Sequence, residues 1–367
     1  MNNSNRKKLF IVRRESGGIG GAEKVACRFV KAFSKHFDTE LIHAGKMING
    51  VRIQGTKGPS WLKCLRFAKS ARKFLDKQED VLVLSMERGV PGTIYRVGDG
   101  VHKVWMKIKY NNSIEWAFNP INWILPNLEK ISIEQSKCVV PNSSMVKAEI
   151  LEHYKISCEK INVIHNGYDP NIYYPLETEA RLKLRSKLGM DNNDLNLLFS
   201  GSGWERKGLR SALRLLALII QKTKRVKLWI AGNGNVNKFR KVAKGFGIDN
   251  SITFLGEVEN IASFYQTSDF LILPTKYDPF SNSCLESLAC GCPVVTTVKN
   301  GASEIISNKV NGVIINENDL DLLVLARQIA QVVKDKKTAT EKSSYNFKQF
   351  NDDAEKNIFL EILSHIK

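Results

Sequence analysis

Short apolar runs alternate with segments of helical periodicity along most of this chain of 367 residues. In the second half, apolar runs of strand length fall at 195–200, 226–231, 252–255, 270–273, 294–297 and 313–315. In the first half they fall at 9–12, 40–43, 81–85, 138–140 and 162–164, with helical patterns at 22–36, 61–77, 127–135 and 143–154. Strands that alternate with helices form parallel sheets covered on both faces. Because the chain is long enough for two cores, we expect an α/β fold of two doubly wound domains.

The domain boundary is expected where the alternation stops. The stretch N-G-Y-D-P-N-I-Y-Y-P at 166–175 interrupts every periodicity. We therefore expect a first domain at residues 1–168 and a second at 175–340. A polar segment at 338–344 precedes a last helical pattern, so we expect residues 345–367 to return to the first domain.

The most informative motif follows one of the strands of the second half. A loop with Asp278 leads into the small-residue turn Ser281-Asn282-Ser283, which opens a helix carrying Glu286. A helix N-terminus at the carboxyl edge of a sheet offers amides to a phosphate, and a carboxylate there can bind ribose hydroxyls. The motif indicates a nucleoside diphosphate site. An ordinary strand, loop and helix with a Ser/Asn N-cap is the alternative.

Two adjacent cations, Arg206 and Lys207, follow the first strand of the second half at the start of a helix. Cations are unfavourable at that end of the helix dipole, so we expect an anion to compensate them. In a doubly wound domain the pair would lie beside the turn at 281–283. Two cations next to a helix N-terminus predict a diphosphate clamp.

A glycine-rich turn, S-G-G-I-G-G-A-E with Gly17 and Gly18, follows the first strand and opens a helix. Such a turn lets a ligand approach the backbone closely. A dinucleotide fingerprint does not fit, because Glu23 stands at the third glycine position and the second strand ends at 43–45 without a carboxylate. These observations argue against a nicotinamide-dependent oxidoreductase.

In the first half, the stretch Y-R-V-G-D-G-V-H contains Asp99 and His102. Both side chains are candidates for contacting a polar substrate. An ordinary loop aspartate and a partly solvated histidine are the alternative.

The chain carries a formal net charge of +18, which indicates an anionic partner. Residues 1–170 hold 28 Lys/Arg against 16 Asp/Glu, and the remainder holds 27 against 21. The segment 57–77 is basic with interleaved aromatic and apolar residues, and 105–126 holds three of the six tryptophans beside lysines. Helix packing explains both segments in the ordinary way. Docking to an anionic membrane or an acidic acceptor is the alternative.

The seven cysteines include no C-x-x-C pair, so we predict reduced thiols and no metal site.

Three motifs together resemble glycosyltransferase family 4: S-G-G-I-G-G-A-E-K near the start, R-K-G after the first strand of the second half, and the acid-x7-E helix with A-C-G-C-P-V-V-T-T. This resemblance covers essentially the whole chain. It implies the GT-B architecture, in which two Rossmann-like domains face each other across a cleft. The stretch Y-R-V-G-D-G-V-H and the aromatic-basic segment after it are similar to the lipopolysaccharide core glucosyltransferase I branch.

The family resemblance implies a retaining, metal-independent transfer of a sugar from a nucleotide diphosphate sugar, with no bound cofactor. The domain at 1–168 would bind the acceptor, and the domain at 175–340 would bind the donor. Arg206 and Lys207 would hold the diphosphate and neutralise its charge as it leaves.

The other site residues are assigned by the same resemblance. Glu286 would hold the ribose hydroxyls, and Asp278 would lie against the donor sugar. Asp278 stands where the family usually has glutamate, which is one methylene longer, so the donor sugar remains open. The amides of Asn282 and Ser283 would bind the sugar or the phosphate, and Gly18 would approach the diphosphate closely. Asp99 and His102 would lie beside the acceptor or the reacting carbon.

The expected function is a hexosyltransferase that moves glucose from UDP-glucose to a lipopolysaccharide core or another anionic glycolipid. It is expected in the cytoplasm, bound peripherally to the inner face of the bacterial inner membrane. A family 4 enzyme acting on a capsule, glycoprotein or other glycolipid acceptor is the alternative. A nucleic-acid-binding protein is a remote alternative, because no nucleic-acid module signature is present.

Overall fold

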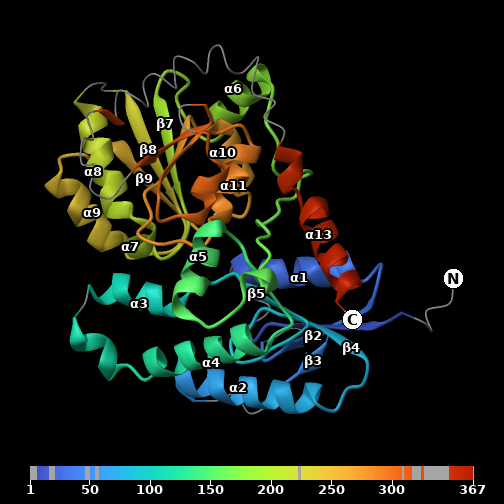
Figure 1. The fold of residues 1–367 in the computed structure, drawn as a ribbon. Helices are drawn as coiled ribbons and strands as arrows, with labels where there is room; N and C mark the ends of the chain where they lie inside the picture. The colour runs from blue at the N-terminus through green and yellow to red at the C-terminus, as the bar shows by residue number, and fades with distance from the viewer. Residues whose placement is uncertain are drawn as a thin grey trace. The chain divides into compact units, whose positions relative to one another are not determined.

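The computed structural model describes residues 6–15, 21–45, 50–53, 58–111, 113–221, 225–307, 310–315, 324–325 and 347–366. The chain divides into two compact units, Met1–His165 with Asp353–Lys367, and Asn166–Asp352. Each unit is built on one six-stranded sheet in which neighbouring strands are parallel (Figure 1). The α/β fold expected from the alternation of strands and helices is confirmed.

The first unit has the sheet order β3-β2-β1-β4-β5-β6. Its strands are β1 (Lys8–Val12), β2 (Asp38–His43), β3 (Val51–Arg52), β4 (Val81–Ser85), β5 (Ile94–Val97) and β6 (Cys138–Pro141). Its helices include α1 (Gly21–Phe33), α2 (Ser60–Leu75), α3 (His102–Tyr110), α4 (Ile121–Gln135), α5 (Ser144–His153) and nearly all of α13 (Asp352–His365), with short 3-10 helices η2 (Ile114–Phe118) and η3 (Cys158–Lys160).

The central strand β1 shows why this sheet is covered on both faces. Leu9 and Ile11 belong to a core cluster with residues of α1 and α13. Phe10 and Val12, which point the other way, belong to a second cluster with residues of α2 and α4. A strand buried on both faces reads as a continuous apolar run, which is what the sequence shows.

The terminal helix α13 lies beside α1 in the first unit (Figure 1). Phe359 of α13 packs edge-on against Phe29 of α1, with ring centroids 5.2 Å apart. The buried Glu355 forms ion pairs with Arg28 of α1 and with Arg96 of β5. A carboxylate shared by two guanidinium groups therefore ties the end of the chain to the sheet.

The second unit has the sheet order β12-β11-β10-β7-β8-β9. Its strands are β7 (Leu195–Ser200), β8 (Val226–Ala231), β9 (Ile252–Gly256), β10 (Phe270–Leu273), β11 (Val294–Thr297) and β12 (Gly312–Ile315). Its described helices include α6 (Thr178–Lys187), α7 (Trp204–Lys207), α8 (Leu209–Ile220), α9 (Val236–Gly245), α10 (Ile261–Thr267) and α11 (Asn282–Ala289), with short 3-10 helices η4 (Asp249–Ser251), η5 (Gly301–Ile305) and η6 (Phe347–Phe350).

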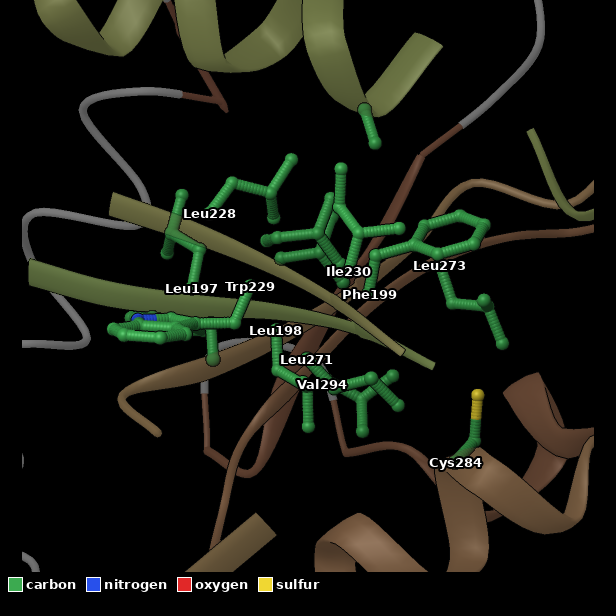
Figure 2. Close-up of a cluster of buried hydrophobic side chains, with 14 of the residues drawn as sticks. Leu197, Leu198, Phe199, Leu228, Trp229, Ile230, Leu271, Leu273, Cys284 and Val294 are labelled. Atoms are coloured by element: carbon green, nitrogen blue, oxygen red, sulfur yellow. The ribbon is translucent and has the colours of Figure 1, made fainter. Parts of the chain in front are cut away.

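The core of the second unit is continuous through its sheet. Figure 2 shows side chains of β7, β8 and β10 on both faces of the sheet, with Cys284 of α11 pointing toward it. Counted along the chain, the strands of this unit follow the same order as those of the first unit. Both sheets therefore have the doubly wound topology. In each sheet the second and third strands extend to one side of the first strand, and the fourth, fifth and sixth extend to the other side.

The strands expected in the second half are confirmed to within one residue at each end. The strand expected at 162–164 is wrong, because the isolated bridge to β6 lies at Ile161, and the stretch adds only two hydrogen bonds, from the amides of Asn162 and Ile164 to β6. β3 and β5 were not predicted. The charged Arg96 in the middle of β5 interrupts the apolar pattern by which a buried strand is recognised.

Candidate active site

The candidate site of the second unit lies at the switch point of its sheet. From β7 the sheet continues to β8 and β9, and from β10 it continues to β11 and β12. Ligands of open parallel sheets bind outside the carboxyl ends of the strands at this point. The loop after β7 carries Arg206 and Lys207, and the loop after β10 carries Asp278. The topology therefore brings these three residues to one edge.

Arg206 and Lys207 are held by the short helix α7. Trp204 anchors this helix in the core, with its ring stacked on Phe254 at a centroid distance of 5.5 Å. The carbonyl of Arg206 accepts hydrogen bonds from the Lys276 amide (2.8 Å) and the Thr275 hydroxyl (3.0 Å). The two cations therefore sit on a turn that is fixed to the loop after β10.

Gly208 ends α7 in the left-handed conformation, with φ of +81°. A Cβ at this position would lie 1.8 Å from the carbonyl oxygen of Pro274, which is far inside van der Waals contact. We expect Gly208→Ala to displace the turn that carries the two cations. The variant should bind nucleoside diphosphates at least about tenfold more weakly and melt at a lower temperature, measured by calorimetry and thermal unfolding.

Gly247→Ala is the matched control for this prediction. Gly247 also has a positive φ, +69°, but no atom lies within 4 Å of the Cβ position. This variant carries the conformational cost without the clash, so its nucleotide affinity should stay that of the parent protein. Equal affinities in the two variants would contradict the role assigned to Gly208.

Asp278 lies between the two cations. Its Oδ2 accepts hydrogen bonds from Lys207 Nζ at 2.5 Å and from Arg206 Nη1 at 3.2 Å. The side chains of Asp278 and Lys207 are 8% and 11% exposed, whereas that of Arg206 is 34% exposed. Burial alone would raise the pKa of Asp278, but the charges of Lys207 and Arg206 outweigh it and lower the pKa. The residue is therefore a buried carboxylate neutralised by two cations.

Helix α11 begins next to this cluster, with Ser281 as its N-cap residue. The hydroxyl oxygen of Ser281 lies 3.4 Å from Lys207 Nζ and completes the partners of the ammonium group. The first amides of a helix have no intrahelical acceptors, so this end of α11 is suited to an anion. The arrangement joins two cations, a helix N-terminus and a carboxylate at one edge of the sheet.

The other predicted residues of α11 have separate partners. Asn282 Oδ1 accepts a hydrogen bond from Asn166 Nδ2 at 2.5 Å. Glu286 is half-buried and shares a hydrogen bond with the Tyr173 hydroxyl. Burial and then the charge of Glu286 raise the pKa of Tyr173. Ser283 is hydrogen-bonded to Tyr265, another tyrosine of this unit. These three residues follow Ser281, and each has a partner outside the cation pair.

Asn300 is a residue of this site that the sequence analysis missed. It is fully buried, and its Oδ1 accepts hydrogen bonds from the amides of Ser281 (3.2 Å) and Ala302 (3.1 Å). The residues on either side of Asn300 hold the backbone of Asp278, through the Lys299 carbonyl and the Gly301 amide. The loop after β11 therefore positions both Asp278 and the start of α11. No local pattern marks this role, because the partners lie about twenty residues apart.

Asp99 lies at the corresponding edge of the first unit. Its Oδ2 is 3.0 Å from Arg13 Nη1, after β1, and 3.7 Å from Arg88 Nη1, after β4. Partial withdrawal of the carboxylate from water would raise its pKa. The two guanidinium groups outweigh that effect and bring the pKa to about 2. Asp99 is therefore ionised at any physiological pH and fixed between two arginines.

His102 begins α3 and takes its own partners. Its ring Nε2 lies 3.3 Å from Asn122 Oδ1. The amide nitrogen of Asn122 donates to Tyr110 and to the Trp116 carbonyl, so its oxygen faces the ring and the ring Nε2–H donates. Neutral His102 then has Nδ1 as its acceptor nitrogen.

We expect His102 to titrate below the ordinary histidine pKa of about 6.5. Burial and then the charge of Arg88 lower its pKa, because both disfavour the imidazolium ion. The unfolded chain therefore binds this proton first, and the free energy of unfolding should fall as the pH drops below 6.5. A ring NMR titration, with His102→Asn to assign the signal, checks the prediction. A pKa above 6.5 would contradict it.

Helix α4 holds the Asp99–His102 loop through buried polar residues that the sequence analysis also missed. Glu129 is fully buried and accepts hydrogen bonds from Arg88 Nε (2.8 Å), the His102 amide (3.0 Å) and the Tyr154 hydroxyl (2.7 Å). Arg88 also donates to the Gly100 carbonyl at 2.9 Å. Polar residues on the inner face of a helix weaken its amphipathic pattern, so the sequence analysis did not identify Glu129 as a residue that holds the loop.

Gly17 and Gly18, which the sequence analysis placed at the diphosphate, lie outside the described residues. Within the described ranges, no three His, Cys, Asp or Glu side chains gather in a way that could hold a metal ion. No described helix is long and apolar enough to cross a membrane.

Two family models match the two halves of the chain. Residues 19–172 match "Glycosyltransferase Family 4", and residues 180–349 match "Glycosyl transferases group 1". Two doubly wound units with parallel sheets, one of which has a site at its switch point, define a protein of GT-B architecture. Because the two models together account for most of its length, the chain belongs to glycosyltransferase family 4.

Curated relatives match part of the chain. An uncharacterized glycosyltransferase of Methanocaldococcus jannaschii is 29% identical over 190 residues, which are 51% of this chain and 48% of that protein. The alpha-monoglucosyldiacylglycerol synthase of Streptococcus pneumoniae is 30% identical over 205 residues, 54% of this chain and 46% of that protein. The chain thus matches slightly less than half the length of these relatives.

Solved structures match the whole fold at low identity. WaaG, a glycosyltransferase involved in lipopolysaccharide biosynthesis, superimposes with a TM-score of 0.80 at 16% identity, over 95% of this chain and 98% of that chain. Anabaena HepE in complex with UDP-glucose gives a TM-score of 0.72 at 19% identity, over 97% and 99%. At these identities the likeness concerns the fold.

Proposed function

We propose that the protein is a retaining glycosyltransferase that moves a hexose, glucose, from a UDP-sugar to a lipopolysaccharide core acceptor. The observation that carries the proposal is the cation pair of Arg206 and Lys207 at the switch point of the second sheet, with Lys207 next to Ser281 at the N-terminus of α11. This arrangement suits a diphosphate, and a UDP-glucose complex of one protein of the same fold supports the choice of donor.

The second unit is proposed as the donor domain. Arg206 and Lys207 bind the diphosphate next to Ser281, with the amides of Asn282 and Ser283 as further donors. Glu286 binds the ribose hydroxyls, and Asp278 faces the donor sugar. On the basis of the sequence alone, Gly17 and Gly18 are also proposed to approach the diphosphate.

The proposed reaction breaks the bond between the sugar C1 and the phosphate oxygen and forms a bond from C1 to the acceptor oxygen on the same face. The acceptor hydroxyl gives its proton to the leaving phosphate. Negative charge grows on that phosphate, so preorganised cations and amides lower the barrier. The site residues supply this stabilisation, so no metal ion is required by the proposal.

The first unit is proposed as the acceptor domain. Asp99 is an ionised carboxylate and His102 a neutral imidazole with an acceptor nitrogen, so both can accept hydrogen bonds from sugar hydroxyls. A lipopolysaccharide acceptor is supported by the likeness to WaaG, which is involved in lipopolysaccharide biosynthesis, and a glycolipid acceptor by the Streptococcus pneumoniae alpha-monoglucosyldiacylglycerol synthase. Another glycan acceptor is the second candidate, because the relatives differ in substrate.

Peripheral contact with an anionic membrane is proposed for the first unit, on the inner face of the bacterial inner membrane. Three large apolar side chains are exposed near the lysines of α3: Ile114 (73%), Phe118 (82%) and Trp123 (53%). Trp123 also lines a groove of about 590 Å³, together with other aromatic residues and with Lys103 and Lys107. Apolar residues bordered by cations suit an anionic interface.

The membrane proposal predicts binding to phosphatidylglycerol vesicles that is lost at high salt, and weak binding to phosphatidylcholine vesicles. Phe118→Ser should reduce binding to the anionic vesicles, measured by co-sedimentation. Equal binding to both lipids would remove the electrostatic account.

The test of the proposed function is incubation with UDP-glucose and purified, truncated lipopolysaccharide core. The expected product gains the mass of one hexosyl residue, and its NMR spectrum shows the anomeric configuration of the donor. Transfer only to another glycan would show that lipopolysaccharide core is not the acceptor. An inverted product would overturn the retaining mechanism, and the absence of transfer from any nucleotide sugar would overturn the function.

A further inference from the structure

Asp278 occupies the place that the site offers to an anion. Its carboxylate is within hydrogen-bond distance of both cations, and Lys207 Nζ at 2.5 Å is the closer partner. Lys207 has a second acceptor, the Ser281 hydroxyl, at 3.4 Å. A buried ammonium group keeps its charge only when an anion or several acceptors lie next to it. The protein thus carries its own counterion for the cation pair.

The backbone of Asp278 is held by contacts that do not involve its carboxylate. The amide donates to the Lys299 carbonyl at 3.0 Å, and the carbonyl accepts from the Gly301 amide at 2.9 Å. A change of the Asp278 side-chain torsion therefore leaves the loop in place. Arg206, with a third of its side chain exposed, is the cation that an incoming anion reaches first.

We propose that Asp278 competes with the diphosphate for Arg206 and Lys207 and so promotes release of the nucleoside diphosphate product. This inference rests on the proposed function. When the diphosphate binds, it shares or takes the two cations from the carboxylate. After transfer, the carboxylate returns to Lys207 and weakens the hold on the product.

This role differs from a contact between Asp278 and the donor sugar. A contact with sugar hydroxyls changes the affinity for the nucleotide sugar and leaves the affinity for the bare nucleoside diphosphate unchanged. Competition for the cations changes the affinity for the bare diphosphate. The two roles therefore separate in the binding of UDP, which carries no sugar.

The experiment measures UDP and uridine binding by calorimetry at fixed salt. Asp278→Asn removes the charge and keeps the size, so UDP should bind about tenfold more tightly, which corresponds to about 1.4 kcal/mol. Uridine has no phosphate, and its affinity should not change. Asp278→Glu restores the charge and should return the UDP affinity toward that of the parent protein.

Two further variants complete the test. Asp191→Asn is the matched control, because Asp191 is also paired with an arginine of the same unit but is 48% exposed on the surface. It should leave UDP binding unchanged. Asp278→Ser is a second neutral variant in case Asp278→Asn does not fold, as judged by circular dichroism.

The outcomes separate the inference from the proposed function. Tighter UDP binding by a folded neutral variant supports the competing role. Unchanged or weaker UDP binding overturns it, and Asp278 is then a fixed partner that positions the cations. If the parent protein and every variant fail to bind UDP, the proposed UDP-sugar function fails as well.

Discussion

Lys207→Ala is expected to lower the rate of sugar transfer by about 10²–10³, the cost of removing one preorganised group that stabilises developing charge. Lys207 Nζ lies at the switch point between Asp278 and Ser281, where the proposed leaving phosphate gains charge. Its side chain is 11% exposed, so little water is present to replace it. The rate is measured as release of the nucleoside diphosphate at saturating acceptor.

The control for Lys207→Ala is Lys244→Ala, which removes an exposed lysine from α9 of the same unit. This variant should keep the parental rate. Circular dichroism and thermal unfolding show whether Lys207→Ala remains folded, since the substitution also deprives Asp278 of a cation. A folded Lys207→Ala protein with the full rate would exclude the proposed role.

Glu355→Ala is expected to have the largest effect on stability, a loss of about 3–5 kcal/mol, as for a buried ion pair that loses one partner. Glu355 is 1% exposed and pairs with Arg28 and with Arg96, whose side chain is 3% exposed. The substitution takes the shared carboxylate from both guanidinium groups. Denaturant unfolding gives the free energy.

Hydrogen exchange then shows where the stability is lost. Protection should fall in α13, α1 and β5 and stay unchanged in the strands of the second unit. Glu361→Ala is the control, because Glu361 lies on the exposed side of the same helix. A Glu355→Ala protein that unfolds like this control would show that the buried pair does not hold α13.

The sequence predicted the features that depend on residues close together along the chain. Strands buried on both faces, such as β10, are continuous apolar runs, and the turn at 281–283 opens a helix. The doubly wound topology then places Arg206, Lys207 and Asp278 at one edge, because the carboxyl ends of parallel strands meet there. The cation pair and its neighbourhood followed from these two steps.

The features that were missed depend on contacts between distant residues. Arg96 interrupts the pattern of β5, and the carboxylate that neutralises it lies 259 positions later. Glu129 and Asn300 hold loops of the two sites from the inside of the fold, where a polar residue looks out of place in a periodic pattern. The pairing of Asp278 with both cations depends on side-chain positions that only the folded unit fixes.

The donor site is best tested by calorimetric titration of the protein with UDP, with GDP, ADP and NAD as comparisons. We expect that UDP binds, that NAD does not, and that Arg206→Ala and Lys207→Ala each weaken UDP binding by about tenfold or more. Binding of another nucleoside diphosphate in place of UDP would support the diphosphate site but show that the donor is a different nucleotide sugar. Failure of every nucleoside diphosphate to bind, or equal UDP binding by the parent and both variants, would contradict the donor site.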